Sequence, residues 1–434
     1  MKSSFRIVST CLMLSLFASV AAVAHDNWPQ WRGPGWTNVS TEKSIPVEFG
    51  TDKNLLWRVE MPGPAGSSPI VWNDTVFVTS ADGDNLVVIA LNIAGKELWR
   101  QTLGGQNKSI RMDNANYASP SPMTDGEHVW ATSAAGVLHC FTFDGKPVWT
   151  KDLQIEYGEF DIQFGLSTTP ILDNGRLYLQ LIHGSMRDKL PSVGWVISLD
   201  AKSGKEIWKF KRETEATVEN KHAYTSPVIY RDDSRAFLIT HGADYAIGHD
   251  LQDGHELWRM GGLNNKESYN PYLRFVSSPT CVPGAIIVPS AKNGPVLALR
   301  PEKLKGDVTG DEGALHWRLN RGTPDVASPL VDVEQKLVYL CHESGLLIVV
   351  DMENGKELFK ERFFADKHRS SPVLVGNKIV ITSRNGDVLV VEGGKEPKVL
   401  AKNSLGEETT ASPAVSNGRL FIRTFEALYA FGTK

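Results

Sequence analysis

The chain has 434 residues, of which 41% are hydrophobic and 22% are charged, a balance typical of a globular protein with a large core. Its 46 Lys and Arg residues stand against 50 Asp and Glu residues, which gives a formal net charge of −4. That charge argues against the basic surface needed to bind phosphate backbones, so we expect no nucleic-acid partner.

The first 24 residues have the features of an export signal. Lys2 and Arg6 supply a positive start, residues 7–23 are mostly apolar, and Ala22-Val23-Ala24 offers a small-x-small cleavage site. The apolar run is shorter than the roughly 20 residues that span a bilayer, and no Cys stands at the cleavage point to form a lipobox. We therefore expect residues 1–24 to be removed and the mature protein to be periplasmic or secreted, not membrane-spanning. The alternative is an uncleaved anchor.

Residues 25–50 form a loop-like segment rich in aromatic residues. Trp28, Trp31 and Trp36 fall within about ten residues of it. Such a group would be a liability if exposed, so we expect the segment to pack on the domain that follows, across a sheet edge. The alternative is a ligand-stacking platform.

Recurring Ser-Pro or Thr-Pro steps divide the rest of the chain into eight units. The prolines stand at 69, 122, 170, 227, 279, 329, 372 and 413, on average about 49 residues apart. After each step come an apolar run, a turn, a second run, an Asp or Asn with a Gly turn, and a short stretch closed by an aromatic residue. This order predicts one four-stranded antiparallel meander per unit. Because Pro cannot donate to a ladder, the first strand is expected at the inner edge of its unit.

One aromatic position recurs at the end of the units. A Gly-x-x-x-Trp pattern ends at Trp99, Trp149, Trp208, Trp258 and Trp317, with Phe359 as a variant and Trp57 in the corresponding place near the N-terminus. Five of the 12 Trp residues share this slot, so we expect these aromatic side chains to fill a repeated cavity between neighbouring units.

The two ends of the repeat region predict a closed ring. The unit that begins at Ser412-Pro413 has three runs before Lys434, whereas residues 54–59 resemble a fourth strand that no first three strands precede. Supplying this strand from the N-terminal side completes the last unit and removes exposed sheet ends. The predicted fold is therefore all-β: an eight-bladed β-propeller of four-stranded antiparallel blades over residues 51–434, closed by an N-terminal strand.

On these repeats the sequence resembles the pyrroloquinoline quinone (PQQ) repeat propellers, whose blades carry a Trp near the end of the fourth strand. Residues 28–34 (WPQWRGP), residues 305–309 and the ending from residue 412 onward resemble a secreted bacterial branch described as PQQ-like. The family includes quinoprotein alcohol dehydrogenases and a non-enzymatic propeller lipoprotein of the outer-membrane β-barrel assembly machine. The resemblance implies the fold and leaves the function open.

For a quinoprotein dehydrogenase, the resemblance implies a quinone held between a Trp and a disulfide of adjacent cysteines, with Ca²⁺ beside a catalytic Asp. The chain has no Cys-Cys step, and about 51 residues per blade leave little room for the insertions that bury the cofactor. We therefore assign no catalytic residue and no metal ligand and expect no cofactor, with PQQ and calcium kept as the alternative.

The function that we expect is a non-catalytic binding or scaffold module for a protein, peptide or glycan, acting as a monomer. A third hypothesis is a polysaccharide-active enzyme at the channel mouth. The motifs of such chemistry, His-Glu-x-x-His and Gly-x-Ser-x-Gly among them, are not present in the sequence.

The three cysteines after the predicted signal, Cys140, Cys281 and Cys341, lie in β-like runs. A free Cys in such a run is commonly a small buried hydrophobe. The odd number leaves at least one thiol outside any intramolecular disulfide, and whether any two of them pair stays open.

Strand direction predicts where a ligand would bind. With the first strand innermost, the loop entering it and the loop joining the second and third strands emerge on one face, around the channel mouth. The candidate ligand-binding residues on these loops are Asn116, Tyr117, His222, Tyr224, Tyr272, Arg274, Asp325, His368 and Arg369, together with His183, His241, Lys292, His342 and Arg384. This set suits a carboxylate-bearing or polyhydroxyl ligand. The alternative is that these side chains pair with one another and with water.

Overall fold

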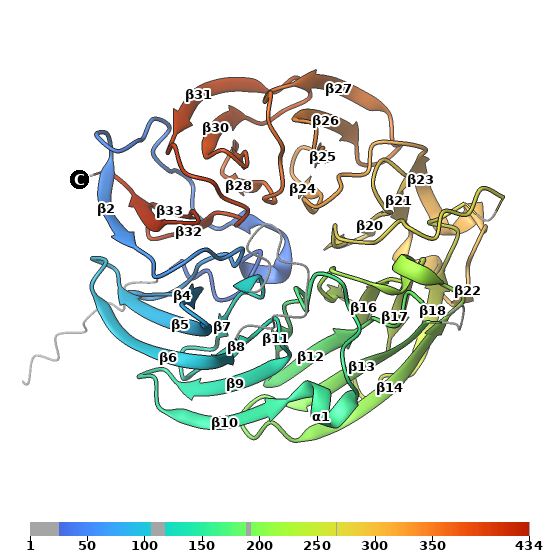
Figure 1. The fold of residues 1–434 in the computed structure, drawn as a ribbon. Coiled ribbons are helices and arrows are strands. Elements are labelled where there is room, and N and C mark those ends of the chain that lie inside the picture. Colours follow the sequence, from blue (N-terminus) through green and yellow to red (C-terminus); the bar gives the residue numbers. More distant parts are fainter. Residues whose placement is uncertain (1–25, 106–117, 188–191, 266, 434) are drawn as a thin grey trace, which may run out of the picture.

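The computed structural model describes residues 26–105, 118–187, 192–265 and 267–433, which form eight β-sheets arranged in a ring (Figure 1). The predicted signal segment lies outside the described residues. Within these ranges, every helix falls short of the length and apolar character needed to cross a membrane. The predicted eight-bladed propeller with four-stranded antiparallel blades is confirmed.

Blades 1 to 4 follow one another along the chain, each running from the innermost strand to the outermost. Their strands are β3 (Ile70–Trp72), β4 (Thr75–Asp82), β5 (Asn85–Asn92) and β6 (Glu97–Gly105); β7 (Met123–Thr124), β8 (His128–Thr132), β9 (Val137–Thr142) and β10 (Pro147–Asp152); β11 (Ile171–Asp173), β12 (Arg176–Leu181), β13 (Ser192–Asp200) and β14 (Glu206–Thr214); and β15 (Val228–Arg231), β16 (Ala236–Gly242), β17 (Tyr245–His249) and β18 (Glu256–Met260).

Blades 5 to 8 repeat this order, and the last blade takes its outermost strand from the N-terminal side. Their strands are β19 (Thr280–Val282), β20 (Ala285–Pro289), β21 (Val296–Leu299) and β23 (Leu315–Leu319); β24 (Leu330–Asp332), β25 (Leu337–Cys341), β26 (Leu346–Asp351) and β27 (Glu357–Arg362); β28 (Val373–Val375), β29 (Lys378–Thr382), β30 (Asp387–Glu392) and β31 (Lys398–Ser404); and β32 (Ala414–Ser416), β33 (Arg419–Arg423), β34 (Ala427–Phe431) and β2 (Leu55–Glu60).

Short elements complete the described part of the chain. Two extra strands pair in parallel with a blade: β1 (Val39–Ser40) with β28, and β22 (Gly306–Asp307) with β18. The helical turns are η1 (Pro34–Trp36), α1 (Leu153–Tyr157), η3 (Val218–Lys221), η4 (Pro301–Lys303) and η5 (Glu312–Ala314).

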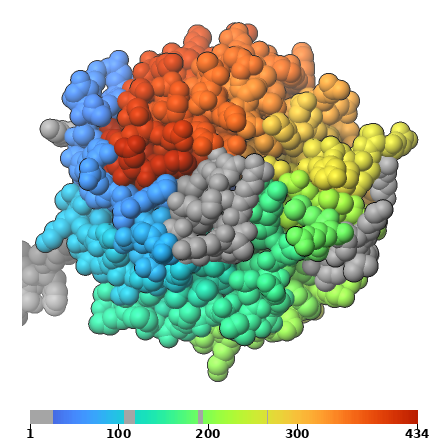
Figure 2. Space-filling model, viewed as in Figure 1, coloured from blue at the N-terminus to red at the C-terminus, as the bar shows by residue number. Residues whose placement is uncertain are grey.

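The ring closes through β2. This strand pairs antiparallel with β34, so that Trp57 lies opposite Ala430 and Val59 opposite Leu428. In the space-filling view, the blue N-terminal residues lie directly beside the red C-terminal blade (Figure 2). The prediction that an N-terminal strand completes the last blade is confirmed.

Residues 28–39, which we call the channel segment, run through the channel against the inner edges of the blades. Figure 1 shows this blue segment at the centre of the ring. Trp28 exchanges two main-chain hydrogen bonds with Val71 of blade 1, each 2.8 Å long. Farther along, Pro29 accepts from blade 2, the Gln30 side chain bonds to blade 3, Arg32 bonds to blade 5 and Asn38 accepts from blade 7. The segment therefore supplies hydrogen-bond partners for strand edges that would otherwise face the channel.

Five of the six recurring Trp residues lie between blades, where each packs on the Gly of the next blade. The indole N–H groups of Trp57, Trp99, Trp149, Trp208 and Trp317 donate to the main-chain oxygens of Ile93, Phe143, Ala201, Leu251 and Met352 over 2.7 to 3.2 Å. A Cβ at the glycine of the following blade would meet the same indole; at Gly145 it would lie 2.6 Å from the Trp99 ring. Trp258 is fully buried in a different setting, beside the extra strand β22.

Substitution of Gly145 tests this contact. Gly145 has a φ of +88°, and an added methyl group would collide with Trp99, whereas Gly175 has a φ of +73° and open space around it. Gly175→Ala should cost about 1–2 kcal/mol for the left-handed backbone alone. Gly145→Ala should cost roughly 1–3 kcal/mol more, because overpacking adds to the same backbone cost. Urea unfolding of both variants measures the difference, and equal losses would contradict the contact.

Candidate functional site

A cavity of about 220 Å³ opens at the end of the channel where the first strands begin. Its wall consists of two layers of residues just before the prolines. The layer next to Pro comprises Ser68, Ser121, Thr169, Ser226, Ser278, Ser371 and Ser412, and the layer two residues earlier comprises Gly66, Ser119, Ser167, Tyr224, Val276, Val326, Arg369 and Thr410. Trp31 of the channel segment, Phe164, Arg274 and Asp325 complete the lining.

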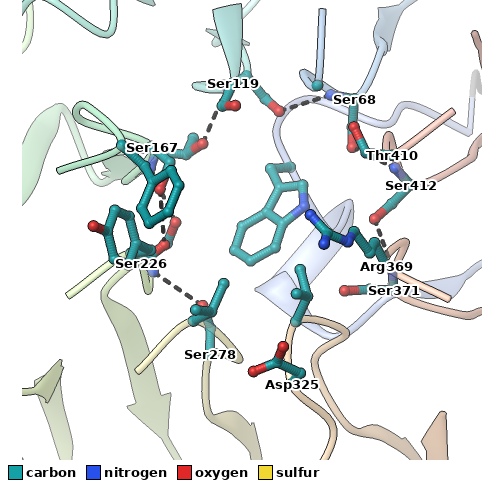
Figure 3. Close-up of a pocket in the computed structure, with 18 of the residues that line it drawn as sticks. Ser68, Ser119, Ser167, Ser226, Ser278, Asp325, Arg369, Ser371, Thr410 and Ser412 are labelled. Atoms are coloured by element: carbon teal, nitrogen blue, oxygen red, sulfur yellow. Dashed lines mark hydrogen bonds between the residues drawn. The ribbon is translucent and has the colours of Figure 1, made fainter. Parts of the chain in front are cut away.

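The layer next to Pro forms a closed ring of hydrogen bonds, which we call the hydroxyl ring. It consists of Ser68, Ser121, Thr169, Ser226, Ser278, Ser328, Ser371 and Ser412. In each case the backbone N–H donates to the hydroxyl oxygen of the next blade, over 2.9 to 3.2 Å, and Ser412 donates to Ser68 (Figure 3). The repeated Ser-Pro or Thr-Pro step in the sequence therefore corresponds to a hydrogen bond between neighbouring blades at the channel wall.

Two groups of charged side chains stand at the mouth. In the first, the Arg274 guanidinium pairs with the Glu219 carboxylate at 2.8 Å and lies over the Phe164 ring, 4.9 Å from its centroid. Phe164 in turn meets Tyr224 edge to face, with ring centroids 5.8 Å apart. The cation is thus held between a carboxylate and an aromatic face, both of which stabilise it.

The second group brings together loops of blades 5, 6 and 7. Lys292 Nζ lies 2.9 Å from Glu343 and 3.7 Å from Asp325, and Arg369 lies 3.6 Å from Glu343. Burial raises the pKa of Asp325, and the neighbouring Glu343 carboxylate raises it further. Burial opposes ionisation of Glu343 as well, but hydrogen bonds from Lys292 and Asp325 lower the pKa of this carboxyl. Asp325 is therefore the carboxyl of the pair that retains a proton more readily.

The structure places part of the predicted ligand-binding set around the cavity. Tyr224, Arg274, Asp325 and Arg369 line it, and Lys292 is tied to Asp325. Asn116 and Tyr117 fall outside the described residues.

The predicted histidines lie elsewhere, and burial removes most of them from the ligand-accessible surface. His222, His241 and His368 are fully buried; His241 meets Phe275 edge to face, and His368 stacks against Phe364. His183 packs against Phe160, and His342 bonds through Nδ1 to the Ser344 hydroxyl at 2.9 Å. Among the other predicted residues, Tyr272 is exposed away from the cavity lining, and Arg384 pairs with Glu408.

Several residues of the site were not predicted. Phe164, Glu219 and Glu343 were not assigned to the mouth, and Trp31 was considered only as an alternative stacking platform. The hydroxyl ring was missed although its signal was present, since a Ser or Thr precedes the Pro in all eight repeats.

The described residues do not fit the quinone site that the PQQ resemblance implies. Cys140, Cys281 and Cys341 are free thiols in three different blades, and none lines the cavity. The carboxylates at the mouth are engaged by Lys292 and Arg369, so they are not arranged as a calcium ligand set. We therefore derive no reaction step through PQQ.

Two small acidic groups lie on hairpin turns: Asp125 with Glu127 and His128, and Asp250 with Asp253 and His255. In both, the Asp carboxylates already accept backbone N–H groups of the same turn. These hydrogen bonds stabilise the turns, which explains why Asp residues stand there.

Comparisons with known proteins agree with the fold. A family model described as outer membrane protein assembly factor BamB matches residues 47–111 and 84–300, more than half of the chain. BamB of Burkholderia pseudomallei is 20% identical over 241 residues, 55% of each chain. A polyvinylalcohol dehydrogenase of a Pseudomonas species is 27% identical over 195 residues, 42% of this chain and 29% of that protein. The match thus spans about half or less of the length of these relatives.

Solved structures share the architecture at low sequence identity. BamB from Moraxella catarrhalis superposes with a TM-score of 0.59 at 14% identity, over 88% of this chain and 97% of that one. A europium-containing methanol dehydrogenase reaches 0.68 at 11% identity, over 94% and 98%. An assembly factor and a dehydrogenase therefore share the same fold, and fold alone does not separate the two functions.

The buried histidines predict a loss of stability in mild acid. Burial lowers the pKa of His241 to about 3 and that of His368 to about 4. Below pH 6.5 the unfolded chain binds protons that the folded protein does not, so the free energy of unfolding should decrease as the pH falls toward 4. Each such histidine contributes up to about 1.4 kcal/mol per pH unit.

This expectation is checked by thermal unfolding of His368→Gln between pH 7 and 4.5. Its melting temperature should depend less on pH than that of the unsubstituted protein, whatever its absolute stability. His255→Gln is the control, since His255 is exposed and the hydrogen bond that its Nδ1–H donates to the Asp253 carboxylate raises its pKa. If the melting temperature of His368→Gln depends on pH as strongly as that of the unsubstituted protein, then protonation of the His368 imidazole does not destabilise the fold.

Proposed function

Because this chain belongs to the PQQ-like β-propeller family that includes outer membrane protein assembly factor BamB, we propose that it is a non-catalytic binding module of the cell envelope. In this proposal residues 1–24 are a cleaved export signal, and the mature protein works in the periplasm or outside the cell as a monomer. Its main partner is another protein, held at the face where the entering loops emerge.

The observation that carries this proposal is the exposed Tyr272 on the loop before blade 5. Tyr272 is 64% exposed, although burying a large aromatic side chain is energetically favourable. Tyr and Arg are the residue types most enriched at the centre of protein interfaces, and Arg274 stands two residues away.

Hydrogen bonds hold the loop around Tyr272 in one conformation. The Tyr269 hydroxyl donates to Asp244 at 2.8 Å, and Asn264 Nδ2 donates to the Asn270 main-chain oxygen at 3.0 Å. The Tyr272 N–H donates to Asn270 Oδ1 at 3.0 Å, and Arg274 is fixed by Glu219. An aromatic side chain presented on a preorganised loop loses little conformational entropy on binding, which favours a partner-binding role.

The pairing of the charged side chains at the mouth also supports a binding role over a catalytic one. Every acidic residue described above in the two charged groups has a cationic neighbour within 4 Å, so none stands free as a general base or nucleophile. Retention of quinone absorbance after incubation with PQQ and Ca²⁺, together with dye-linked alcohol oxidation, would instead support the dehydrogenase hypothesis.

Site-specific photo-crosslinking tests the proposed partner surface. A photoreactive residue at position 272, introduced into the exported full-length protein in cells, should give one discrete adduct with a protein. The matched control is position 333, because Val333 is 48% exposed on the turn between β24 and β25, at the end of the first strand opposite to the entering loops. In addition, Tyr272→Ala should weaken the captured complex about 30-fold, the effect of losing a contact of ~2 kcal/mol, with an unchanged melting temperature. Equal adducts at both positions, or none at 272, would overturn the proposal.

A further inference from the structure

We propose that the cavity above the hydroxyl ring is a binding site for a single carboxylate-bearing sugar residue, such as the terminal uronic acid of a glycan. Tyr272 is not among the residues that line this cavity, and the inference does not depend on the proposed protein partner. Three features of its lining carry the inference: unused hydrogen-bond donors, an incompletely paired arginine, and aromatic faces held in fixed positions.

The hydroxyl ring offers donors to the cavity. Each hydroxyl oxygen accepts one backbone N–H, which leaves its own O–H free to rotate and donate. Within the described part of the chain, none of these eight hydroxyls donates to a protein acceptor, and all but Ser328 line the cavity. A ligand that satisfies such a wall must be rich in oxygen acceptors.

Arg369 adds a positive charge to the same wall. Its guanidinium lies 3.6 Å from Glu343, beyond hydrogen-bond length, and its buried Nε has no partner among the described residues. The carboxylate that lines the cavity, Asp325, is already engaged with Lys292 and Glu343. Figure 3 shows Arg369 at the right of the serine-lined opening and Asp325 at its lower edge. Because a guanidinium pairs best with a planar oxyanion, Arg369 favours a carboxylate in the ligand.

Aromatic side chains provide the apolar contacts that a pyranose ring requires. Trp31, Phe164 and Tyr224 all line the cavity. Trp31 is held firmly, because its neighbour Arg32 is only 1% exposed, donates to the Pro279 main-chain oxygen at 2.6 Å and lies 5.5 Å from the centroid of the Trp31 ring. Small-molecule sites typically combine such rigid apolar walls with a few convergent polar groups.

The closed floor favours a terminal residue over an extended chain. Gln30 bonds to Leu172 on one side of the channel and Arg32 bonds to blade 5 on the other, so Trp31 lies between them and the segment blocks passage below the ring. A cavity of about 220 Å³ above this floor accepts the end of a ligand and not its middle. Among carboxylate-bearing groups, a sugar uses the hydroxyl donors and the aromatic faces together.

Calorimetric titration of the full mature protein tests the proposal. The probes are D-glucuronic and D-galacturonic acid, the neutral sugars D-glucose and D-galactose, an N-acetylated tripeptide with a free carboxyl terminus, and PQQ with Ca²⁺. We expect at least one uronic acid to bind at least tenfold more tightly than its neutral counterpart. Arg369→Gln should remove that preference, and Trp31→Phe should weaken the uronic acid severalfold while the protein stays folded.

Tyr272→Ala serves as the matched control and should leave uronate binding unchanged, which separates this site from the proposed protein interface. Three results would overturn the proposal. The first is equal affinity for acidic and neutral sugars, and the second is binding of the tripeptide or of PQQ without binding of a uronic acid. The third is that the folded protein binds no uronic acid. None of these results affects the crosslinking test at position 272, so the two proposals fail independently.

Discussion

One hydrogen bond, repeated at every blade junction, sets the geometry of the channel. A backbone N–H in one blade donates to the hydroxyl of the Ser or Thr before the proline in the next, and the last blade returns the bond to the first. Because a short hydroxyl side chain, Ser in seven blades and Thr169 in one, stands at every junction, a bond of 2.9 to 3.2 Å joins each pair of innermost strands. A larger residue at any of these positions would push two blades apart, and the displacement would have to be absorbed around the whole ring.

A second set of contacts performs the same task at the periphery. There, an indole from one blade covers the turn glycine of the next and donates to a carbonyl beside it. The inner contact is polar and directional, whereas the outer contact is largely apolar, with one hydrogen bond from the indole. Where the outer contact changes, at Trp258, an added strand takes its place. The blade junctions thus tolerate variation at the rim more readily than at the channel.

The architecture could be predicted because its signals repeat. Proline spacing, the Trp position and the incomplete last blade each follow from local rules of strands and turns, and the pairing of β2 with β34 agrees with them. The site could be predicted only in part. Arg274, Asp325 and Arg369 were found because loops entering the first strands converge on one mouth. Phe164, on the loop entering blade 3, and Glu343, on the loop between β25 and β26, were not selected although they lie on the same kinds of loop. Burial of His222, His241 and His368 depends on packing between loops, which spacing in the sequence does not reveal.

The channel segment and β2 also constrain how the molecule can fold. β2, near residue 57, pairs with β34, near residue 430, and Asn38 bonds to Leu374. The contacts that complete the ring therefore join segments far apart in the sequence. Such pairing has a high contact order and forms slowly, after the local hairpins. Blades 1 to 7 can form as synthesis proceeds, but the closing strand stays unpaired until β34 has been made. During that interval the half-made blade 8 presents open strand edges, and the protein is most vulnerable to aggregation and to chaperone capture.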